Sequence, residues 1–180
     1  MIVPNINTSN PNIELVKPDI RRDPKISLRW INSVDGPSTL ASMGNIDSDI
    51  KPTTIGDEIE RTDNFIHDKN QLNWMIKVDN EIVGAIWVDL LSKDYLPSPS
   101  VHLMVGDSNA RNKGVGYASL ESVINYMENE GYDEIFTRHL TSNIPSSKLL
   151  SSLKFDNIGS PYKDKDNLEW QNLSRKLSNT

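Results

Sequence analysis

Apolar residues recur along the chain with two different spacings, which separate the predicted strands from the predicted helices. Alternation at every second position is typical of strands, and recurrence every three or four positions is typical of helices. We predict strands at residues 25–31, 73–78, 81–91, 100–105, 134–140, 155–158 and 168–173. We predict helices at residues 34–43, 55–66, 115–129 and 143–153. The pattern therefore predicts an α/β (α+β) fold, with a mixed, mostly antiparallel central sheet and helices on both faces.

The first 24 residues differ from the rest, because they are rich in Asn and Pro and show neither spacing. We predict an extended N-terminal arm at residues 1–24, followed by one domain at residues 25–180. A chain of 180 residues suits a single domain with a well-buried core. The arm would lie against this domain or against a neighbouring subunit, so a homodimer is one option.

The most informative stretch lies between the strand that ends at residue 105 and the helix that follows it. Its sequence is Arg111-Asn112-Lys113-Gly114-Val115-Gly116-Tyr117-Ala118. The first amides of a helix have no intrahelical acceptor, and the helix dipole places partial positive charge there, so such a turn can hold phosphate. Gly114 and Gly116 lack Cβ atoms and let a pyrophosphate approach the backbone. Arg111 and Lys113 can add charge-assisted contacts.

Two other phosphate-binding motifs are excluded by spacing. The turn lacks the Gly-Lys-Ser/Thr of a P-loop, and no acidic residue ends a second strand as a dinucleotide-binding fold requires. Instead, the stretch resembles the signature Arg/Gln-x-x-Gly-x-Gly/Ala of the GCN5-related N-acetyltransferase (GNAT) family, with Arg111, Gly114 and Gly116 at the signature positions. The segment from Asn143 to Phe155 is similar to that family's Asn-x-x-Ser/Ala helix. The resemblance spans about residues 25–175 and is closest to the ribosomal-protein alanine acetyltransferase branch.

This resemblance implies an acyltransferase that uses acetyl-coenzyme A (acetyl-CoA) as its cofactor and acetyl donor. In the family, the strand before the turn splays from the next strand, and its main chain holds the pantetheine and the acetyl carbonyl. The resemblance places cofactor binding at Leu103, Met104, Val105, Arg111, Asn112, Lys113, Gly114, Val115, Gly116, Tyr117, Ala118 and Asn143. The acetyl group would pass directly to a primary amine, either a protein N-terminus or a small polyamine or aminoglycoside.

The catalytic candidates are Ser146 and His102. Amide formation from a thioester needs a neutral amine and a protonated leaving thiolate. The family often protonates the thiolate with a Tyr on its last helix, where this chain has Leu150, and Ser146 is the candidate acid in its place. Several relatives carry a Glu base on the strand that here contains His102, and an imidazole titrates near neutral pH. The alternatives are that Ser146 caps or lines its helix and that His102 is a hydrogen-bonded core residue. His139 is a weaker candidate.

The candidate acceptor contacts are aspartates. Net charge is −6 with both signs interspersed, so no basic footprint indicates nucleic acid, and a cationic substrate is favoured. Asp47 and Asp49 lie in the loop at residues 44–52, which borders the acceptor site in the family. Strict alternation along residues 81–91 puts Asp89 on the face of Trp87. Each aspartate could bind an ammonium, or could simply be a solvated turn residue or the point where a strand reaches the surface.

Cysteine is absent, which excludes a disulfide framework, a thiolate metal site and an acetyl-cysteine intermediate. We predict direct transfer and no metal site. No apolar run approaches the roughly 20 residues of a membrane span, so we expect no membrane partner and a cytoplasmic protein. A second function remains open, a catalytically silent acetyl-CoA-binding sensor or interaction module, because the usual Tyr is missing and the base is uncertain.

Overall fold

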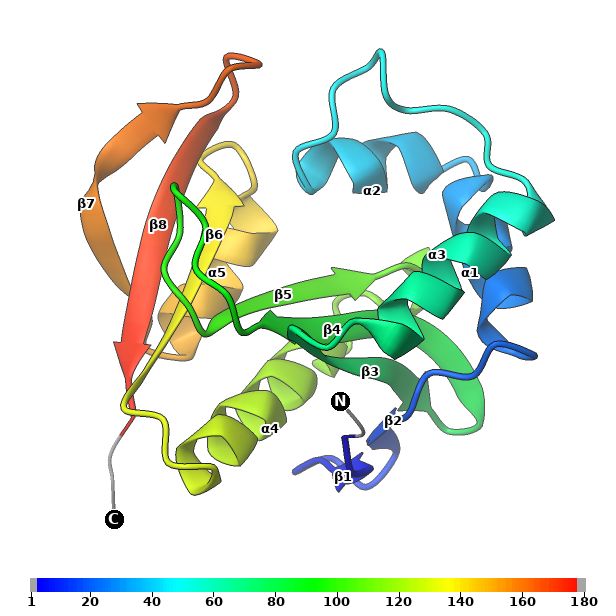
Figure 1. The fold of residues 1–180 in the computed structure, drawn as a ribbon, viewed down its shortest axis with the longest axis horizontal. Helices are drawn as coiled ribbons and strands as arrows, with labels where there is room; N and C mark the ends of the chain where they lie inside the picture. Colours follow the sequence, from blue (N-terminus) through cyan, green and yellow to red (C-terminus); the bar gives the residue numbers. More distant parts are fainter. Residues whose placement is uncertain (1–2, 178–180) are drawn as a thin grey trace.

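One sheet of eight strands runs through residues 3–177, the part of the chain that this computed structural model describes (Figure 1). The strand order is β1-β2-β3-β4-β5-β6-β8-β7. The strands are β1 (Ile6–Asn7), β2 (Ile13–Val16), β3 (Gln71–Val78), β4 (Glu81–Asp89), β5 (Ser100–Val105), β6 (Glu134–Leu140), β7 (Asp156–Lys163) and β8 (Glu169–Lys176). Neighbouring strands are antiparallel except β5 and β6, which are parallel. The predicted mixed, mostly antiparallel sheet is confirmed.

Helices cover both faces of the sheet, as predicted. They are α1 (Asp23–Ile31), α2 (Gly36–Ser42), α3 (Ile55–His67), α4 (Val115–Asn129) and α5 (Ile144–Ser152). Figure 1 shows α4 on one face and α1 and α3 on the other. Within residues 3–177, no helix has the length and apolar character needed to cross a membrane.

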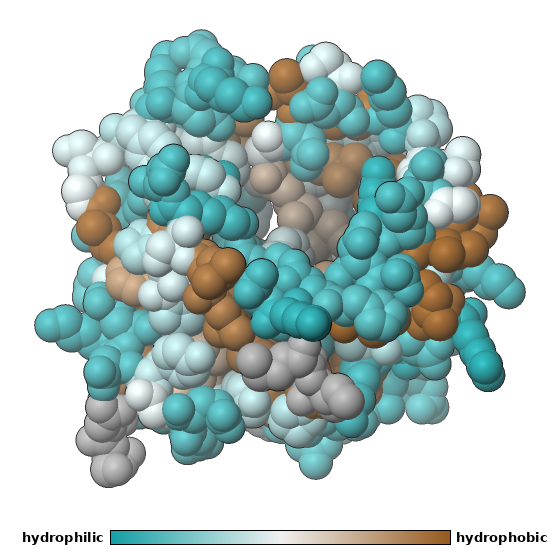
Figure 2. All heavy atoms as spheres, viewed as in Figure 1, coloured by the Kyte–Doolittle hydropathy of each residue, from teal (hydrophilic) through white to brown (hydrophobic). Residues whose placement is uncertain are grey.

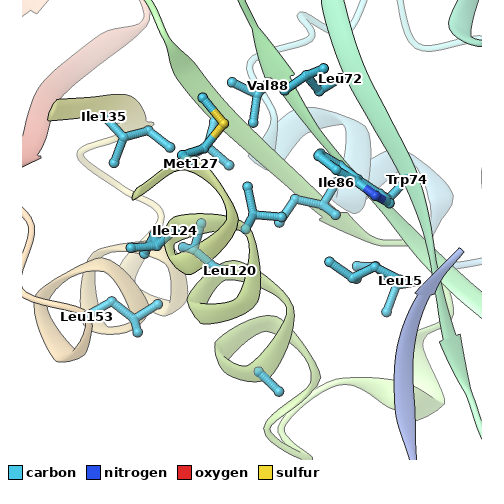
Figure 3. Close-up of a cluster of buried hydrophobic side chains, with 14 of the residues drawn as sticks. Leu15, Leu72, Trp74, Ile86, Val88, Leu120, Ile124, Met127, Ile135 and Leu153 are labelled. Atoms are coloured by element: carbon cyan, nitrogen blue, oxygen red, sulfur yellow. The ribbon is translucent and has the colours of Figure 1, made fainter. Parts of the chain in front are cut away.

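The main hydrophobic core lies between α4 and the sheet. Figure 3 shows Ile124 and Met127 of α4 in one cluster with Ile86 and Trp74 of the sheet, and the side chains of all four are fully buried. Burying each such side chain contributes about 1.5–3 kcal/mol. A second, smaller cluster on the opposite face contains Val16, Trp30, Met75, Ile82 and Ala85. The two clusters fix the sheet between its helical layers.

A β-bulge interrupts the alternation of β4. Ile76 of β3 pairs with Gly84 and Lys77 pairs with Ile82, so Val83 has no partner across the strand pair. Val83 packs in the main core, whereas Ile82 packs in the cluster on the opposite face. Beyond the bulge, the predicted alternation holds. The bulge re-aims the start of β4, and the free carbonyl oxygen of Val83 accepts a hydrogen bond from the amide of Asp107 after β5, at 3.0 Å.

The strands β5 and β6 part soon after they meet. Their register contains one pair, Ser100 with Phe136, and the Thr137 hydroxyl donates to the carbonyl oxygen of Val101 at 2.8 Å. Figure 1 shows β6 turning away from β5 beyond this point. The last four residues of β5 are therefore only half-buried. The parting leaves main-chain groups of a central strand available to a ligand.

The segment at residues 25–31 is a helix, so the predicted strand there is wrong. Helix α1 spans Asp23–Ile31 and has Pro24 in its first turn, where a missing amide hydrogen costs nothing. Ile26 and Trp30 are four residues apart and pack together on the second cluster. In so short a segment, apolar residues four positions apart fit both the period of a strand and the period of a helix. Packing against the face of the sheet favours the helix.

The N-terminal arm contains two strands that its composition did not reveal. Strand β2 pairs with β3, and Leu15 lies opposite Ile76 and is fully buried. Strand β1 pairs with β2 at the edge of the sheet. The arm therefore completes the main core, and four residues in β2 are too few for a periodicity to show. The remaining predicted strands and helices are present, three of them with the predicted bounds and the others with ends shifted by at most five residues.

We predict that Leu15→Ala lowers the free energy of unfolding by about 2–5 kcal/mol, because it removes a fully buried side chain and leaves a cavity. Leu91→Ala is the matched control, since the side chain of Leu91 is 59% exposed and should cost less than about 0.5 kcal/mol. Urea denaturation of both variants measures the difference. Equal effects would show that β2 is not part of the cooperative core.

Candidate active site

A cavity of about 720 Å³ opens where β5 and β6 part. Figure 2 shows this face of the molecule hollowed between α2 and the side formed by β6 and β8. The structure brings most of the predicted site residues to its wall, namely Asp89, His102, Leu103, Met104, Val105, Arg111, Asn112, Gly114, Val115, Gly116, Tyr117, Asn143 and Ser146. Four predicted site residues do not line it: Asp47, Asp49, Lys113 and Ala118.

The turn before α4 has the backbone that a phosphate site requires. Asn112 and Gly114 have positive φ angles of 60° and 77°, and Gly114 is the residue that precedes α4. A Cβ atom on Gly114 would meet no atom within 4 Å, so close packing does not require glycine here. Glycine is favoured by the left-handed backbone, and it leaves the space beside the turn open. The first amides of α4 follow directly and have no acceptor within the helix. The turn therefore fits a pyrophosphate.

Gly116 has a different role. A Cβ atom here would lie 3.2 Å from Cδ2 of Leu103 and 3.3 Å from Cδ2 of Leu149. This glycine therefore lets the first turn of α4 pack closely against β5 and α5. Ala118 is buried in the main core behind the turn, and Lys113 is exposed beside it. Contacts of these two residues with the cofactor remain predictions.

Two hydrogen-bonded side chains hold α2 beside the cavity. The Arg111 guanidinium donates to the carbonyl oxygen of Val105, from Nε at 3.1 Å and Nη2 at 3.0 Å, and Nη2 also donates to the Thr39 hydroxyl at 2.6 Å. Asn143 precedes α5, where its Oδ1 accepts from the amide of Ser146 at 3.1 Å, and its Nδ2 donates to the carbonyl oxygen of Ser42 at 3.0 Å. Arg111 and Asn143 thus position α2, and their predicted cofactor contacts remain predictions.

Asp89 is a buried carboxylate at the end of β4, and three side chains from other positions surround it. It accepts from Gln71 Nε2 at 2.6 Å and from Lys93 Nζ at 2.5 Å, and it lies 3.4 Å from His102 Nε2. Burial opposes its ionisation, but the neighbouring His102 and Lys93 outweigh burial and lower the pKa of Asp89 well below its usual range. Asp89 is therefore ionised at neutral pH, and both of its oxygens already have partners.

His102 lies between this carboxylate and the cavity. Its ring stacks on Trp87, with ring centres 5.4 Å apart, and its Nε2 is 3.3 Å from the Ser100 hydroxyl. The side chain keeps 22% of its surface exposed. An oriented imidazole beside a fixed carboxylate, open to a cavity, can accept a proton from a ligand. His139 also lines the cavity, but its Nδ1 is bonded to the carbonyl oxygen of Leu140 at 2.7 Å and it is nearly buried.

Ser146 lies on the cavity wall at the first turn of α5, half-buried. Its hydroxyl has no hydrogen-bond partner among residues 3–177, whereas its amide is capped by Asn143. The capping role considered for Ser146 therefore belongs to Asn143, and the Ser146 hydroxyl is available to a ligand. Leu150 is buried one turn further along.

Asp47 and Asp49 lie in an exposed turn away from the cavity wall. The Asp49 carboxylate accepts from the Ser48 hydroxyl at 3.2 Å. With Asp89 already surrounded by donors, the structure does not assemble the three aspartates into one surface. Binding of an acceptor ammonium by these aspartates remains a prediction.

Sequence reasoning missed a group of side chains at the opposite wall. The Arg138 guanidinium lies between two rings, 3.9 Å from the centre of Tyr95 and 3.8 Å from the centre of Trp170, and all three residues line the cavity. Arg138 is on β6, Trp170 on β8 and Tyr95 in the loop after β4. Only the folded sheet brings them together, so no local pattern could have indicated the group.

A second cavity of about 350 Å³ lies behind Trp87, between the sheet and the helices α1 and α3. It shares Gln71, Trp87 and Met104 with the first cavity, and the surface that it exposes is mostly apolar. Its two buried carboxylates are paired, Asp23 with Arg22 and Glu58 with Arg61. The second cavity could therefore accommodate an apolar part of a ligand bound in the first.

Solved structures with this fold include three acetyltransferases. RimL, the ribosomal L7/L12 alpha-N-protein acetyltransferase, in complex with coenzyme A, is 14% identical with a TM-score of 0.80, over 97% of this chain and 99% of that chain. The microcin C7 self-immunity acetyltransferase MccE, in complex with acetyl-CoA and AMP, is 14% identical with a TM-score of 0.75, over 93% and 94%. The spermidine N-acetyltransferase from Vibrio cholerae, in complex with CoA and spermine, is 12% identical with a TM-score of 0.71, over 93% and 97%. At such identities the likeness shows the fold alone.

Among curated proteins, none matches the chain significantly by sequence. The model of one domain family does match, the acetyltransferase (GNAT) domain, over residues 18–156. This span includes the phosphate-binding turn, His102 and the start of α5. Since the match covers well over half of the chain, the protein belongs to the GNAT acetyltransferase family, whose acetyl donor is acetyl-CoA.

Proposed function

We propose that the protein is an N-acetyltransferase that passes the acetyl group of acetyl-CoA directly to a primary amine. The acceptor would be a protein N-terminus or a small amine. The observation that carries the proposal is that the His102–Asp89 pair, at 3.4 Å, faces the same cavity as the glycine turn before α4. One cavity would thus hold a base for the acceptor and an anion site for the donor.

The donor would lie along the open side of β5. The amides that follow Gly114 would bind its pyrophosphate, and the main chain of residues 103–105, left without a partner by the parting of β6, would bind its pantetheine. When bound, acetyl-CoA supplies an acetyl thioester, whose carbonyl carbon an amine can attack. An ordered strand edge would also orient the acetyl group for that attack.

His102 would remove a proton from the acceptor ammonium and leave a neutral amine. The ionised Asp89 would orient the imidazole and stabilise its charged form. As the new N–C bond forms and the C–S bond breaks, the Ser146 hydroxyl would give a proton to the leaving sulfur. The direct route suits a chain that has no cysteine to carry the acetyl group.

We predict that Gly114→Val weakens acetyl-CoA binding by more than about tenfold, or about 1.4 kcal/mol, because a branched side chain would fill the space open to the pyrophosphate. Gly131→Val is the matched control. Gly131 has a φ of 85° and open space around a Cβ atom, but it lies after the C-terminal end of α4. Calorimetry of acetyl-CoA binding compares the two variants. Similar losses in both would place the pyrophosphate elsewhere.

We predict that His102→Gln lowers kcat/KM by about 10²–10⁴-fold, the usual contribution of a general base. In the wild-type protein kcat/KM should rise with pH, because only a neutral imidazole can accept a proton from the acceptor, and this rise should disappear in the variant. His139→Gln, a change on the same cavity wall, should retain it. The measurement is thiol release with an amine panel across pH. A His102→Gln enzyme with the wild-type pH profile would exclude His102 as the base.

We predict that Ser146→Ala lowers kcat while the Kd for acetyl-CoA stays within about twofold, since a proton given to the leaving thiolate acts only in the transition state. Ser147→Ala, one position further along α5 and not on the cavity wall, should have little effect on either quantity. Equal kcat for wild type and Ser146→Ala would return Ser146 to a packing role. If no amine in the panel releases thiol although acetyl-CoA stabilises the fold, the silent-sensor alternative would hold instead.

A further inference from the structure

The cavity wall carries more positive than negative side chains, although the whole chain has a net charge of −6. Among the described residues that line it, the charged groups are Lys93, Arg111, Arg138 and Asp89. Lys93 is paired with Asp89, and Arg111 is bonded to Val105 and Thr39. Neither Arg111 nor Arg138 has an ion pair within residues 3–177, but Arg111 already holds α2 through Thr39, whereas Arg138 has no such role at the donor side of the cavity. Its charge therefore needs an explanation that the donor and the His102–Asp89 pair do not give.

Arg138 is held in one orientation. The rings of Tyr95 and Trp170 cover both faces of its guanidinium, and Nη1 donates to the Tyr162 hydroxyl at 3.1 Å. The Trp170 ring is held by a hydrogen bond from its Nε1 to Asp164 at 2.7 Å, and the backbone of Tyr95 is held by one from Asn172 Nδ2 to its carbonyl oxygen at 2.7 Å. Such a clamp immobilises the guanidinium before any ligand binds.

The donor hydrogens of a guanidinium lie in its plane, so rings on both faces leave them free to bind a ligand at the edge. A planar fork of this kind matches a carboxylate or phosphate with two parallel hydrogen bonds. Asp164 is a carboxylate within electrostatic range of Arg138, but the two form no ion pair within residues 3–177. Asp164 is half-buried, and its oxygens accept from Trp170 and from two amides of its own turn. Burial raises its pKa and these hydrogen bonds lower it, and Arg138 makes the smallest of the lowering contributions.

The position of Arg138 favours the acceptor over the phosphates of the donor. Arg138 follows Phe136, which pairs with Ser100 at the start of β5, whereas the glycine turn comes after the end of β5. A strand rises about 3.3 Å per residue, so the two ends of β5 are about 16 Å apart. Burial lowers the pKa of Lys93, but the hydrogen bond and charge of Asp89 leave that pKa raised overall, and the charge of Arg138 makes a small contribution toward lowering it. Arg138 is therefore within electrostatic range of Lys93, the partner of Asp89. Arg138 thus faces the end of the cavity that holds His102.

We propose that Arg138 binds an anionic group of the acceptor, so that the acceptor is a primary amine that also carries a carboxylate or phosphate. The proposal rests on the proposed acetyl transfer at this cavity. A polyamine would meet Arg138 without a matching carboxylate, because Asp89 is surrounded by donors and Asp47 and Asp49 are not on the wall. The two aromatic rings would add apolar contact beside the anion.

The test compares acceptors in pairs that differ only in the anion. Suitable probes are O-phosphoethanolamine with ethanolamine, leucine with leucinamide, and the peptide Ser-Asp-Ala with Ser-Asn-Ala, with spermidine as the cationic reference. Thiol release gives kcat and KM for each probe. In at least one pair, the KM of the anionic member should be lower than that of the neutral member by a factor of about ten, the usual effect of a charged hydrogen-bond partner. A panel in which spermidine or the neutral members are always preferred would overturn the proposal.

Variants assign the preference to Arg138. Arg138→Gln should raise KM for the preferred anionic probe about tenfold and change KM for its neutral partner less than about twofold. Arg138→Lys should restore part of the preference, because it keeps the charge but not the planar fork. Arg29→Gln, an exposed position on α1, is the matched control. An Arg138→Gln variant that raises both KM values equally, or that weakens CoA binding, would show a structural or donor-binding role instead.

Binding measurements separate this proposal from the proposed function. Calorimetry of the same probes with the enzyme–CoA complex reports recognition without turnover. Preferential binding of the anionic members that depends on Arg138, without thiol release from any probe, would support the anion site and contradict acetyl transfer. Turnover with no preference for the anionic members, unchanged in Arg138→Gln, would support acetyl transfer and contradict the anion site.

Discussion

The parting of β5 from β6 is the constraint on which the candidate site depends. Parallel strands normally share evenly spaced hydrogen bonds along their length, yet these two share a single register pair at Ser100 and Phe136. Next to this pair, the Thr137 hydroxyl of β6 donates a hydrogen bond to β5, and beyond it residues of both strands line the same cavity. The unsatisfied main chain is tolerable because it faces a space that a ligand can fill. Binding and catalysis can then share one opening in the sheet.

Charge inside the cavity is arranged in opposition to the charge of the whole chain. An acidic protein would by itself attract cations, but its buried Asp89 is committed to His102, Lys93 and Gln71. Keeping that carboxylate ionised in a buried position requires those donors, and the same donors leave it unable to bind an acceptor ammonium. Under the proposed mechanism, the carboxylate would act through His102, and Arg138 would recognise the acceptor.

Much of the fold could be predicted from sequence because long segments keep a consistent apolar spacing. The helix α4 and the strands β3, β4 and β5 were found this way, and the glycine turn was found because Gly114 needs its left-handed backbone. Short segments failed. Helix α1 has Ile26 and Trp30 at a spacing compatible with both structures, and β2 is too short to show a period. Tertiary packing on the sheet, which no local pattern contains, decides such segments.

The candidate site likewise contains residues that could be predicted from sequence and residues that could not. Residues next to the turn could be located from the chain itself, since the motif is continuous in sequence. The clamp around Arg138 could not, because Tyr95 and Trp170 are 75 residues apart and meet only through the order of β6 and β8 in the sheet. Asp47 and Asp49 lie in a loop adjacent in sequence to site elements, yet they are not among the residues that line the cavity. Contacts that depend on topology lie beyond sequence patterns.

The most direct test of this account is a crystal structure of the protein with coenzyme A bound. The account predicts that the pyrophosphate contacts the amides after Gly114, that the pantetheine follows residues 103–105 of β5, and that the sulfur lies in the gap beside β6 within reach of Ser146. It further predicts that His102 faces the sulfur across the space left for an acceptor. A coenzyme bound away from the turn before α4, or with its sulfur on the far side of the sheet from His102, would contradict it.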